Sequence, residues 1–233
     1  AALKGAHGAT LKLVEKFGLI RTLDDGTAWN GYNVLHMAAA RMGGLMLGYA
    51  QPGGIADIVA AKPKLAFFLG ADEVDFAGFA DSLKVYVGHH GDKGAHYADV
   101  ILPAAAYTEK EGTYVNLEGR VQRSGKAVFA PGDAREDWAI FRALADVLGV
   151  EVGFDSFAEC QAKMFEAVPA LADESLIDYG WSVPSLPAKA EGVISAYPIK
   201  DFYLTNAVAR ASQTMQRCSA ELLSGEEILE AAE

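Results

Sequence analysis

Three short apolar runs in the middle of the chain constrain the fold most strongly. They occupy residues 65–69 (LAFFL), 84–87 (KVYV) and 99–103 (DVILP), and a glycine or a proline ends each of them. Runs of this length between turn residues are typical of buried strands. Short helical patterns separate them, which predicts right-handed crossovers and parallel strands. The sequence therefore predicts an α/β fold with a Rossmann-like, mostly parallel sheet flanked by helices.

Apolar residues recur at helical spacing around these runs. Helices are expected at Gly5–Phe17, Asn33–Leu47, Ile55–Ala61, Phe76–Leu83, from Asp133 or Ala134 to Leu148, and at Phe157–Val168. His36 falls in the second of these helices and is interpreted as a packed or surface histidine, because a metal site would need companion ligands. Alternating residues at 113–115 and 121–123 predict a small antiparallel element with a tight turn at Glu118–Gly119.

The pattern divides the chain into three segments. Residues 1–150 form the α/β domain, residues 151–198 a helix followed by an irregular connection, and residues 199–233 a C-terminal extension. Within the second segment, residues 170–198 lack periodicity and are expected to run over the surface. The tail from Lys200 to Met215 is expected to dock on the α/β body or on a partner, mainly through contacts within the chain, and to bury Phe202 and Tyr203, because its apolar side chains would otherwise form a sizeable exposed patch.

Charge and cysteine usage exclude several classes of protein. The chain has 31 acidic and 20 basic residues, a net charge of −11, and shows no basic face of the kind that binds nucleic acid. Its two cysteines, Cys160 and Cys218, are too few for a four-ligand cluster or a structural zinc site. No apolar run approaches the roughly 18 residues of a membrane-spanning helix. We therefore expect no metal, no nucleic acid and no membrane insertion for this segment.

The central stretch carries a family signature. Residues 97–122 (YADVILPAAAYTEKEGTYVNLEGRVQ) resemble the molybdopterin oxidoreductase family, which includes formate dehydrogenases and nitrate reductases. Other segments resemble one branch of it, the large iron–sulfur subunits of respiratory complex I, which comprise the 75 kDa subunit of mitochondria and its bacterial counterpart. They are residues 29–36 (WNGYNVLH), 88–92 (GHHGD), 135–138 (REDW), 200–207 (KDFYLTNA) and 210–215 (RASQTM).

This resemblance implies a function in electron transfer from NADH to quinone. The segment is expected to be a structural scaffold without its own redox centre, and the iron–sulfur clusters are expected in a part upstream of it. The expected partners are other subunits of the peripheral arm, at the cytoplasmic face of a bacterial inner membrane or the matrix face of a mitochondrial one. Two alternatives stay open: a fragment of a molybdenum enzyme such as a formate dehydrogenase, and a free-standing small-molecule binding module. A cysteine, selenocysteine or serine ligand to molybdenum, upstream, would indicate the former.

The resemblance also suggests ligand-binding candidates. In molybdopterin enzymes the carboxyl ends of the strands hold a pterin dinucleotide, so a vestigial groove is expected there. Its candidate residues in this chain are Asp72, His90, Asp92, Thr113, Asn116 and Arg120. No glycine-rich phosphate-binding motif accompanies them.

The other polar clusters are interpreted structurally. His89, His90 and His96 lie across a glycine-rich loop without the ligand spacing of a known zinc site, so hydrogen bonding within the loop is favoured over metal binding. The carboxylates between Glu109 and Glu118 are not arranged in any recognisable acid–base pair, and turn-stabilising hydrogen bonds are the favoured role of this stretch. No catalytic residue is assigned.

Overall fold

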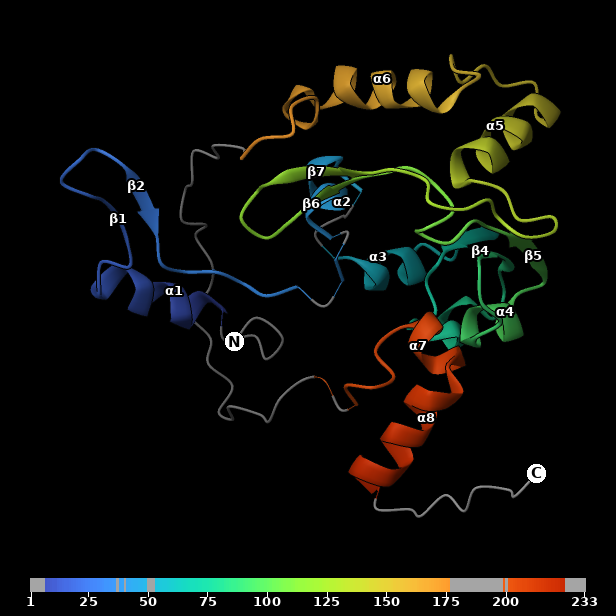
Figure 1. The fold of residues 1–233 in the computed structure, drawn as a ribbon, viewed down its shortest axis with the longest axis horizontal. Coiled ribbons are helices and arrows are strands. Elements are labelled where there is room, and N and C mark those ends of the chain that lie inside the picture. Colours follow the sequence, from blue (N-terminus) through green and yellow to red (C-terminus); the bar gives the residue numbers. More distant parts are fainter. Residues whose placement is uncertain are drawn as a thin grey trace.

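The computed structural model describes residues 7–36, 38–39, 41–49, 53–176, 199 and 201–224. This part of the chain combines helices with one parallel and two small antiparallel sheets (Figure 1). The expected α/β fold class is confirmed. The connection expected over residues 170–198 is described only as far as residue 176, and Lys200 and residues 225–233 of the extension also lie outside the described residues.

The parallel sheet contains the three strands predicted from the apolar runs. Strands β3 (Leu65–Leu69), β4 (Leu83–Gly88) and β5 (Val100–Pro103) lie side by side in chain order. In the register, β4 pairs Val85 with Phe67 on one side and with Val100 on the other. Because β4 is central, residues 85–88 are all buried, whereas the flanking strands are more exposed.

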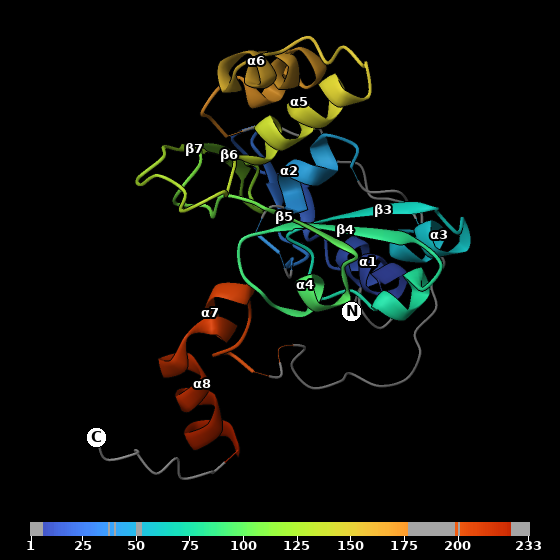
Figure 2. The same ribbon diagram turned by 90° about the vertical axis from the view of Figure 1, so that its right-hand side faces the viewer.

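The two faces of this sheet hold separate cores, because successive side chains of a strand point to opposite faces. On one face Phe68 and Tyr86 pack with Phe76 and Phe79 of the 3-10 helix η2 (Phe76–Phe79). Helices α3 (Ile55–Ala60) and α4 (Lys93–Tyr97) complete that side. The opposite face packs against α5 (Asp137–Val147), whose Ile140 contacts the cluster around Val85 and Val87. Figure 2 shows α5 and α4 on opposite sides of the sheet.

A third core forms around the predicted hairpin. Strands β6 (Gly112–Val115) and β7 (Val121–Ser124) pair in antiparallel fashion, which confirms the expected element. Side chains from the hairpin, from α2 (Arg41–Met46), from α6 (Phe157–Ala167) and from η3 (Pro169–Leu171) meet there. They are Met42, Met46, Val115, Val121, Met164, Phe165, Val168 and Leu171. Helix α6, beyond the expected boundary at residue 150, thus completes a core that the hairpin begins.

The two ends of the described chain form peripheral units. The first comprises α1 (His7–Lys16) and the hairpin of β1 (Ile20–Thr22) and β2 (Ala28–Asn30). At the other end, α7 (Ala207–Ala211) and α8 (Gln213–Ser219) follow one another, and η4 (Ala220–Ser224) continues as a π-helix. Ser212 separates α7 from α8, because its extended backbone ends the first helix and its Oγ accepts the Met215 N–H of the second. In Figures 1 and 2, α8 extends away from the sheet.

Two helix predictions are too long. Residues 33–36 have no regular structure and α2 begins only at Arg41, so the placement of His36 on a helix is wrong. The glycine pair Gly43–Gly44 makes a helix less stable by about 1 kcal/mol per residue than alanine would, which disfavours the long helix that was expected. The helix expected at Phe76–Leu83 is a single 3-10 turn, and Gly78 inside it lets the turn approach Val59 of α3 closely.

The helix expected from Asp133 or Ala134 begins only at Asp137. The preceding backbone is used differently, because Arg135 N donates to Pro103 O at 3.1 Å and Ala105 N donates to Arg135 O at 2.8 Å. Arg135 therefore forms a parallel bridge with Ala104 beside β5. Pairing with the sheet outweighs the helical pattern of the sequence at this point.

Candidate functional site

Asp72 lies at the carboxyl edge of the sheet, by which we mean the loops that follow β3 and β4. Its side chain is only 5% exposed, and its Oδ1 accepts a hydrogen bond of 2.8 Å from the Tyr86 hydroxyl. Burial of the ring, followed by the hydrogen bond to Asp72, raises the pKa of Tyr86 above its usual value. The phenol therefore stays protonated and is a permanent donor to the carboxylate.

Two glycines make room for the Tyr86 ring. A Cβ added to Gly88 or to Gly94 would collide with that ring, and one at Gly94 would also lie 2.9 Å from Asp72 Oδ1. Gly88 ends β4 and Gly94 is in the first turn of α4, so the ring lies between the strand end and the helix. Gly88 and Gly94 thus allow the Tyr86 ring to pack closely beside Asp72.

Arg210 of α7 reaches this edge from the far end of the sequence. Its Nη2 lies 3.4 Å from Asp72 Oδ2, its Nη1 lies 3.1 Å from Glu73 Oε1, and its Nε donates to Asp92 Oδ2. Nη1 also donates to the Leu204 carbonyl at 3.2 Å. The side chain of Arg210 is 22% exposed, so solvent only partly screens these ion pairs. All three guanidinium nitrogens thus contact a carboxylate.

The contact with Arg210 also lowers the pKa of Asp92. Burial acts to raise its pKa, but the hydrogen bond from Arg210 and the positive charges of Arg210 and Lys93 outweigh that effect, and the pKa is lowered. Asp92 is therefore ionised at neutral pH. It also precedes α4, and its carbonyl accepts the backbone N–H groups of Ala95 and His96.

The histidines of the loop contact one another. Nδ1 of His89 lies 2.5 Å from Nδ1 of His90, and Nδ1 of His96 lies 2.9 Å from the Asp92 carbonyl. Burial, followed by the charges of His90 and Lys110, lowers the pKa of His89. Among the described residues, no three His, Cys, Asp or Glu side chains are arranged so that they could hold a metal ion.

The other three candidates lie on the hairpin and organise its packing. Oδ1 of Asn116 accepts the N–H groups of Glu118 at 3.0 Å and Arg120 at 2.8 Å. Thr113 Oγ1 accepts a hydrogen bond of 3.4 Å from Gln161 of α6. Arg120 is exposed, and its backbone forms a bridge with residue 176. No ion pair between Arg120 and a described glutamate is present.

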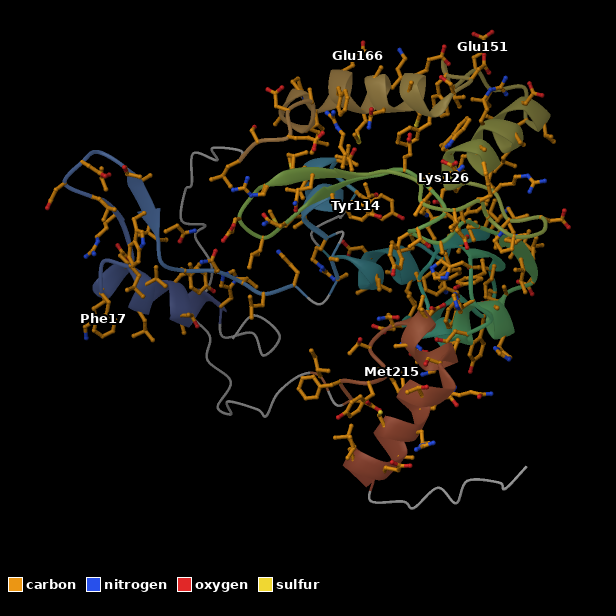
Figure 3. All side chains as sticks on the ribbon, in the orientation of Figure 1. Phe17, Tyr114, Lys126, Glu151, Glu166 and Met215 are labelled. Carbon is orange, nitrogen blue, oxygen red and sulfur yellow. The ribbon has the colours of Figure 1, made fainter. Side chains whose placement is uncertain are left out.

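The six predicted residues lie on two different parts of the structure. Asp72, His90 and Asp92 lie at the carboxyl edge, whereas Thr113, Asn116 and Arg120 lie on the hairpin. Figure 3 labels Tyr114 on the hairpin and Met215 on the C-terminal helices, at separate places in the structure. Tyr86 and Arg210 were not among the predicted site residues, and no local pattern around Arg210 indicates that it contacts Asp72.

A cavity of about 450 Å³ lies beside the carboxyl edge, on the Tyr86 face of the sheet. Its lining residues are Val74, Asp75, Phe76, Ala77, Ala80, Lys84, Lys93 and Tyr97. Two of its four polar side chains have partners in the protein. Lys84 pairs with Asp99 at 2.9 Å, and Asp75 accepts the Ala77 N–H at 3.1 Å.

Comparison with known proteins assigns the chain to a family. The sequence model of the molybdopterin oxidoreductase family matches residues 3–147, well over half of the chain. The chain belongs to the molybdopterin oxidoreductase family. A second model, which describes the C-terminal part of the G subunit of NADH-ubiquinone oxidoreductase, matches residues 182–218 of this molybdopterin oxidoreductase family member.

Several relatives of this family member are subunits of NADH-ubiquinone or NADH-quinone oxidoreductases. It is 44% identical over 208 residues to the mitochondrial 78 kDa subunit of NADH-ubiquinone oxidoreductase from Neurospora crassa. The matched region covers 85% of the chain and 28% of the relative. It is 42% identical over 219 residues to the 75 kDa subunit from Reclinomonas americana, covering 90% and 31%. The G subunit of the NADH-quinone oxidoreductase from Rickettsia prowazekii is 38% identical over 209 residues, covering 89% and 29%.

These matches confirm the resemblance to the large subunits of complex I, and they do not favour the alternative of a formate dehydrogenase fragment. The chain spans about three tenths of the length of the curated relatives that it matches. Within the part that the structure describes, no helix combines the length and the apolar character needed to cross a membrane.

Proposed function

We propose that this chain is a structural part of the large iron–sulfur subunit of an NADH:quinone oxidoreductase, the respiratory complex I, which transfers electrons from NADH to quinone. The similarity to subunits of such enzymes over 85% to 90% of the chain carries the proposal. The segment is a scaffold without a redox centre or an active site of its own, and iron–sulfur clusters are bound by residues upstream of it.

The chemistry of the residues supports a scaffold without a cofactor. Cys160 and Cys218 are the only cysteines of the sequence, and a cluster held by four thiolates would need two more. The carboxyl edge does not fit an anionic pterin dinucleotide. Pyrophosphate groups bind to backbone N–H groups at glycine-rich turns or to cations, whereas this edge presents three carboxylates whose one guanidinium partner is already engaged.

The partners in this proposal are the other subunits of the peripheral arm, without nucleic acid and without direct insertion into the membrane. The complex lies at the cytoplasmic face of a bacterial inner membrane or at the matrix face of a mitochondrial inner membrane. The acidic net charge of −11 agrees with protein partners rather than with nucleic acid.

Affinity purification of the intact parent protein tests the proposal. We expect its tag to bring down the subunits of an NADH:quinone oxidoreductase with NADH-dependent quinone reduction, and metal analysis of the 233-residue chain alone to find neither iron nor molybdenum. His90→Gln should leave quinone reduction per assembled complex unchanged. Stoichiometric iron or molybdenum in the chain alone, or purification without such subunits, would contradict the scaffold role.

A further inference from the structure

We propose that the carboxyl edge of the parallel sheet is a guanidinium-binding site, and that its ligand is Arg210 of the chain's own C-terminal segment, residues 201–224. The site consists of Asp72 and Glu73 in the loop after β3 and Asp92 in the loop after β4. In this role the ion pairs of Arg210 attach the C-terminal segment to the α/β layer, that is, to the parallel sheet and its flanking helices. They also prevent anionic ligands from binding at the edge. The inference goes beyond the proposed scaffold function, because it concerns which ligand this edge accepts.

The geometry matches a guanidinium in particular. Arg210 directs Nε to Asp92, Nη1 to Glu73 and Nη2 to Asp72, so each nitrogen contacts a different carboxylate. A guanidinium carries its five N–H donors in a rigid planar fork, whereas an ammonium group places all its donors on one nitrogen. A lysine at position 210 could not contact all three carboxylates at these positions.

The burial of Asp72 makes this ligand necessary. Its carboxylate is 5% exposed, and its other described side-chain donor, the Tyr86 hydroxyl, carries no charge. A buried charge without a compensating partner is costly, so the positive charge of Arg210 stabilises the folded edge. Asp92 contributes in the same way, since its side chain is 20% exposed and accepts from Nε.

The C-terminal segment is held together internally, and this ionic contact connects it to the sheet. Gln216 Nε2 of α8 donates to the Arg210 carbonyl at 2.6 Å, and Ser219 Oγ donates to Asp201 Oδ2 at 2.5 Å. Within the described part of the chain, every ion pair between residues 201–224 and the α/β layer involves Arg210. Phe202 is 56% exposed, so its expected burial by contacts within the chain is wrong, whereas Tyr203 is half-buried.

The chemistry of the edge excludes phosphates from a position where α/β sheets commonly bind ligands. With Arg210 bound, the guanidinium fills the position between the two loops. Without Arg210, three carboxylates remain and repel anions even more strongly. When the Arg210 side chain is removed, the carboxyl edge should therefore bind a small guanidinium cation and should not bind a dinucleotide.

Removal of the Arg210 side chain in the intact protein tests both parts of the inference. In Arg210→Ala, hydrogen exchange over residues 207–219 should accelerate at least about tenfold, the response to loss of a tertiary contact that holds a local unit. Arg210→Lys should be intermediate. Arg142→Ala is the matched control, since it removes an arginine that contacts Asp146 and Asp155 away from α7, and it should leave this exchange unchanged.

Ligand titration then identifies the class of ligand. Methylguanidinium should bind Arg210→Ala at millimolar concentration and slow exchange at residues 70–74, and it should not bind the wild-type protein at this edge. Inorganic pyrophosphate should bind neither protein.

A second variant covers the case in which Arg210→Ala does not fold. Asp92→Asn removes one of the three carboxylates and keeps the guanidinium, and it must still accelerate exchange over residues 207–219. Unchanged exchange in both variants, equal methylguanidinium binding by wild type and variant, or preferential pyrophosphate binding would overturn the inference. Each of these outcomes is independent of whether the protein assembles with other subunits.

Discussion

Nη2 of Arg210 lies 3.4 Å from Oδ2 of Asp72, although 138 residues separate the two along the chain. The contact joins the loop after the first strand of the parallel sheet to the C-terminal helices. Around it, Tyr86 and two glycines fix the position of the Asp72 carboxylate. The following predictions test how each of these features contributes to stability.

Tyr86→Phe should destabilise the protein by roughly 1–3 kcal/mol, the cost of leaving a buried acceptor without its donor. The substitution removes the hydroxyl that donates to Asp72 at 2.8 Å and changes little else of the ring's shape. Urea unfolding of the intact protein measures the change. Tyr97→Phe is the control and should have almost no effect, because that side chain is 57% exposed. Equal midpoints for both variants would show that the hydrogen bond contributes nothing.

Gly94→Ala should also destabilise, against the usual helix preference. Alanine favours a helix over glycine by about 1 kcal/mol, but its Cβ would collide with the Tyr86 ring and approach Asp72 Oδ1 to 2.9 Å. Overpacking of this kind costs roughly 1–3 kcal/mol. Thermal unfolding distinguishes the two effects. Gly91→Ala, in the loop just before α4 and with nothing within 4 Å of its added Cβ, should be nearly neutral. A stabilised Gly94→Ala protein would contradict the close packing around the ring.

Gly119→Val should damage the hairpin. Gly119 is buried and has φ of 86°, a conformation that a β-branched residue resists. The strain should lower stability by roughly 1–3 kcal/mol, measured as a reduced melting temperature. Gly125→Val is the control, because Gly125 has open space and no left-handed backbone. If both variants melt at the same temperature, the turn does not require glycine.

Acid should loosen the C-terminal segment through Asp92. Its pKa is lowered in the folded protein from an ordinary value of 3.8, since the hydrogen bond and charge of Arg210 outweigh burial. A group with a lowered folded pKa stabilises fully above the unfolded pKa and loses that contribution as pH falls through the folded pKa. Hydrogen exchange over residues 207–219 should therefore be independent of this group near neutrality and accelerate below pH 3.8.

The variant Asp92→Asn isolates this contribution, because it lacks the titrating carboxyl. Its exchange, corrected for intrinsic rates, should already be faster near neutrality and should respond less to acid. Arg210 and Lys93 interact with the Asp92 carboxylate, and Arg210 also contacts the carboxylates of Glu73 and Asp72. The same acid response in both proteins would assign the loosening to those other carboxylates.

The local elements could be predicted from the sequence because they depend on neighbouring residues. The apolar runs at 65–69, 84–87 and 99–103 have the composition and length of strands and lie in the parallel sheet. The alternation around Glu118–Gly119 likewise indicated the hairpin, and Gly119 has the positive φ that its turn requires. Burial agrees with the prediction for the central strand β4, but β5 is largely exposed and β3 is exposed at both ends, so the runs predicted the strands and not the burial of the flanking two.

Tertiary structure decided the rest, because it depends on which distant groups meet. Arg135 follows the sheet rather than the helical pattern, since its backbone pairs beside β5. Asp72 and Asp92 come together because parallel strands end at one edge, a convergence that the sequence predicts. The residue that binds at that edge could not be predicted. Arg210 lies 118 residues from Asp92 and pairs with its carboxylate only once the chain has folded, and no local sequence pattern indicates that contact.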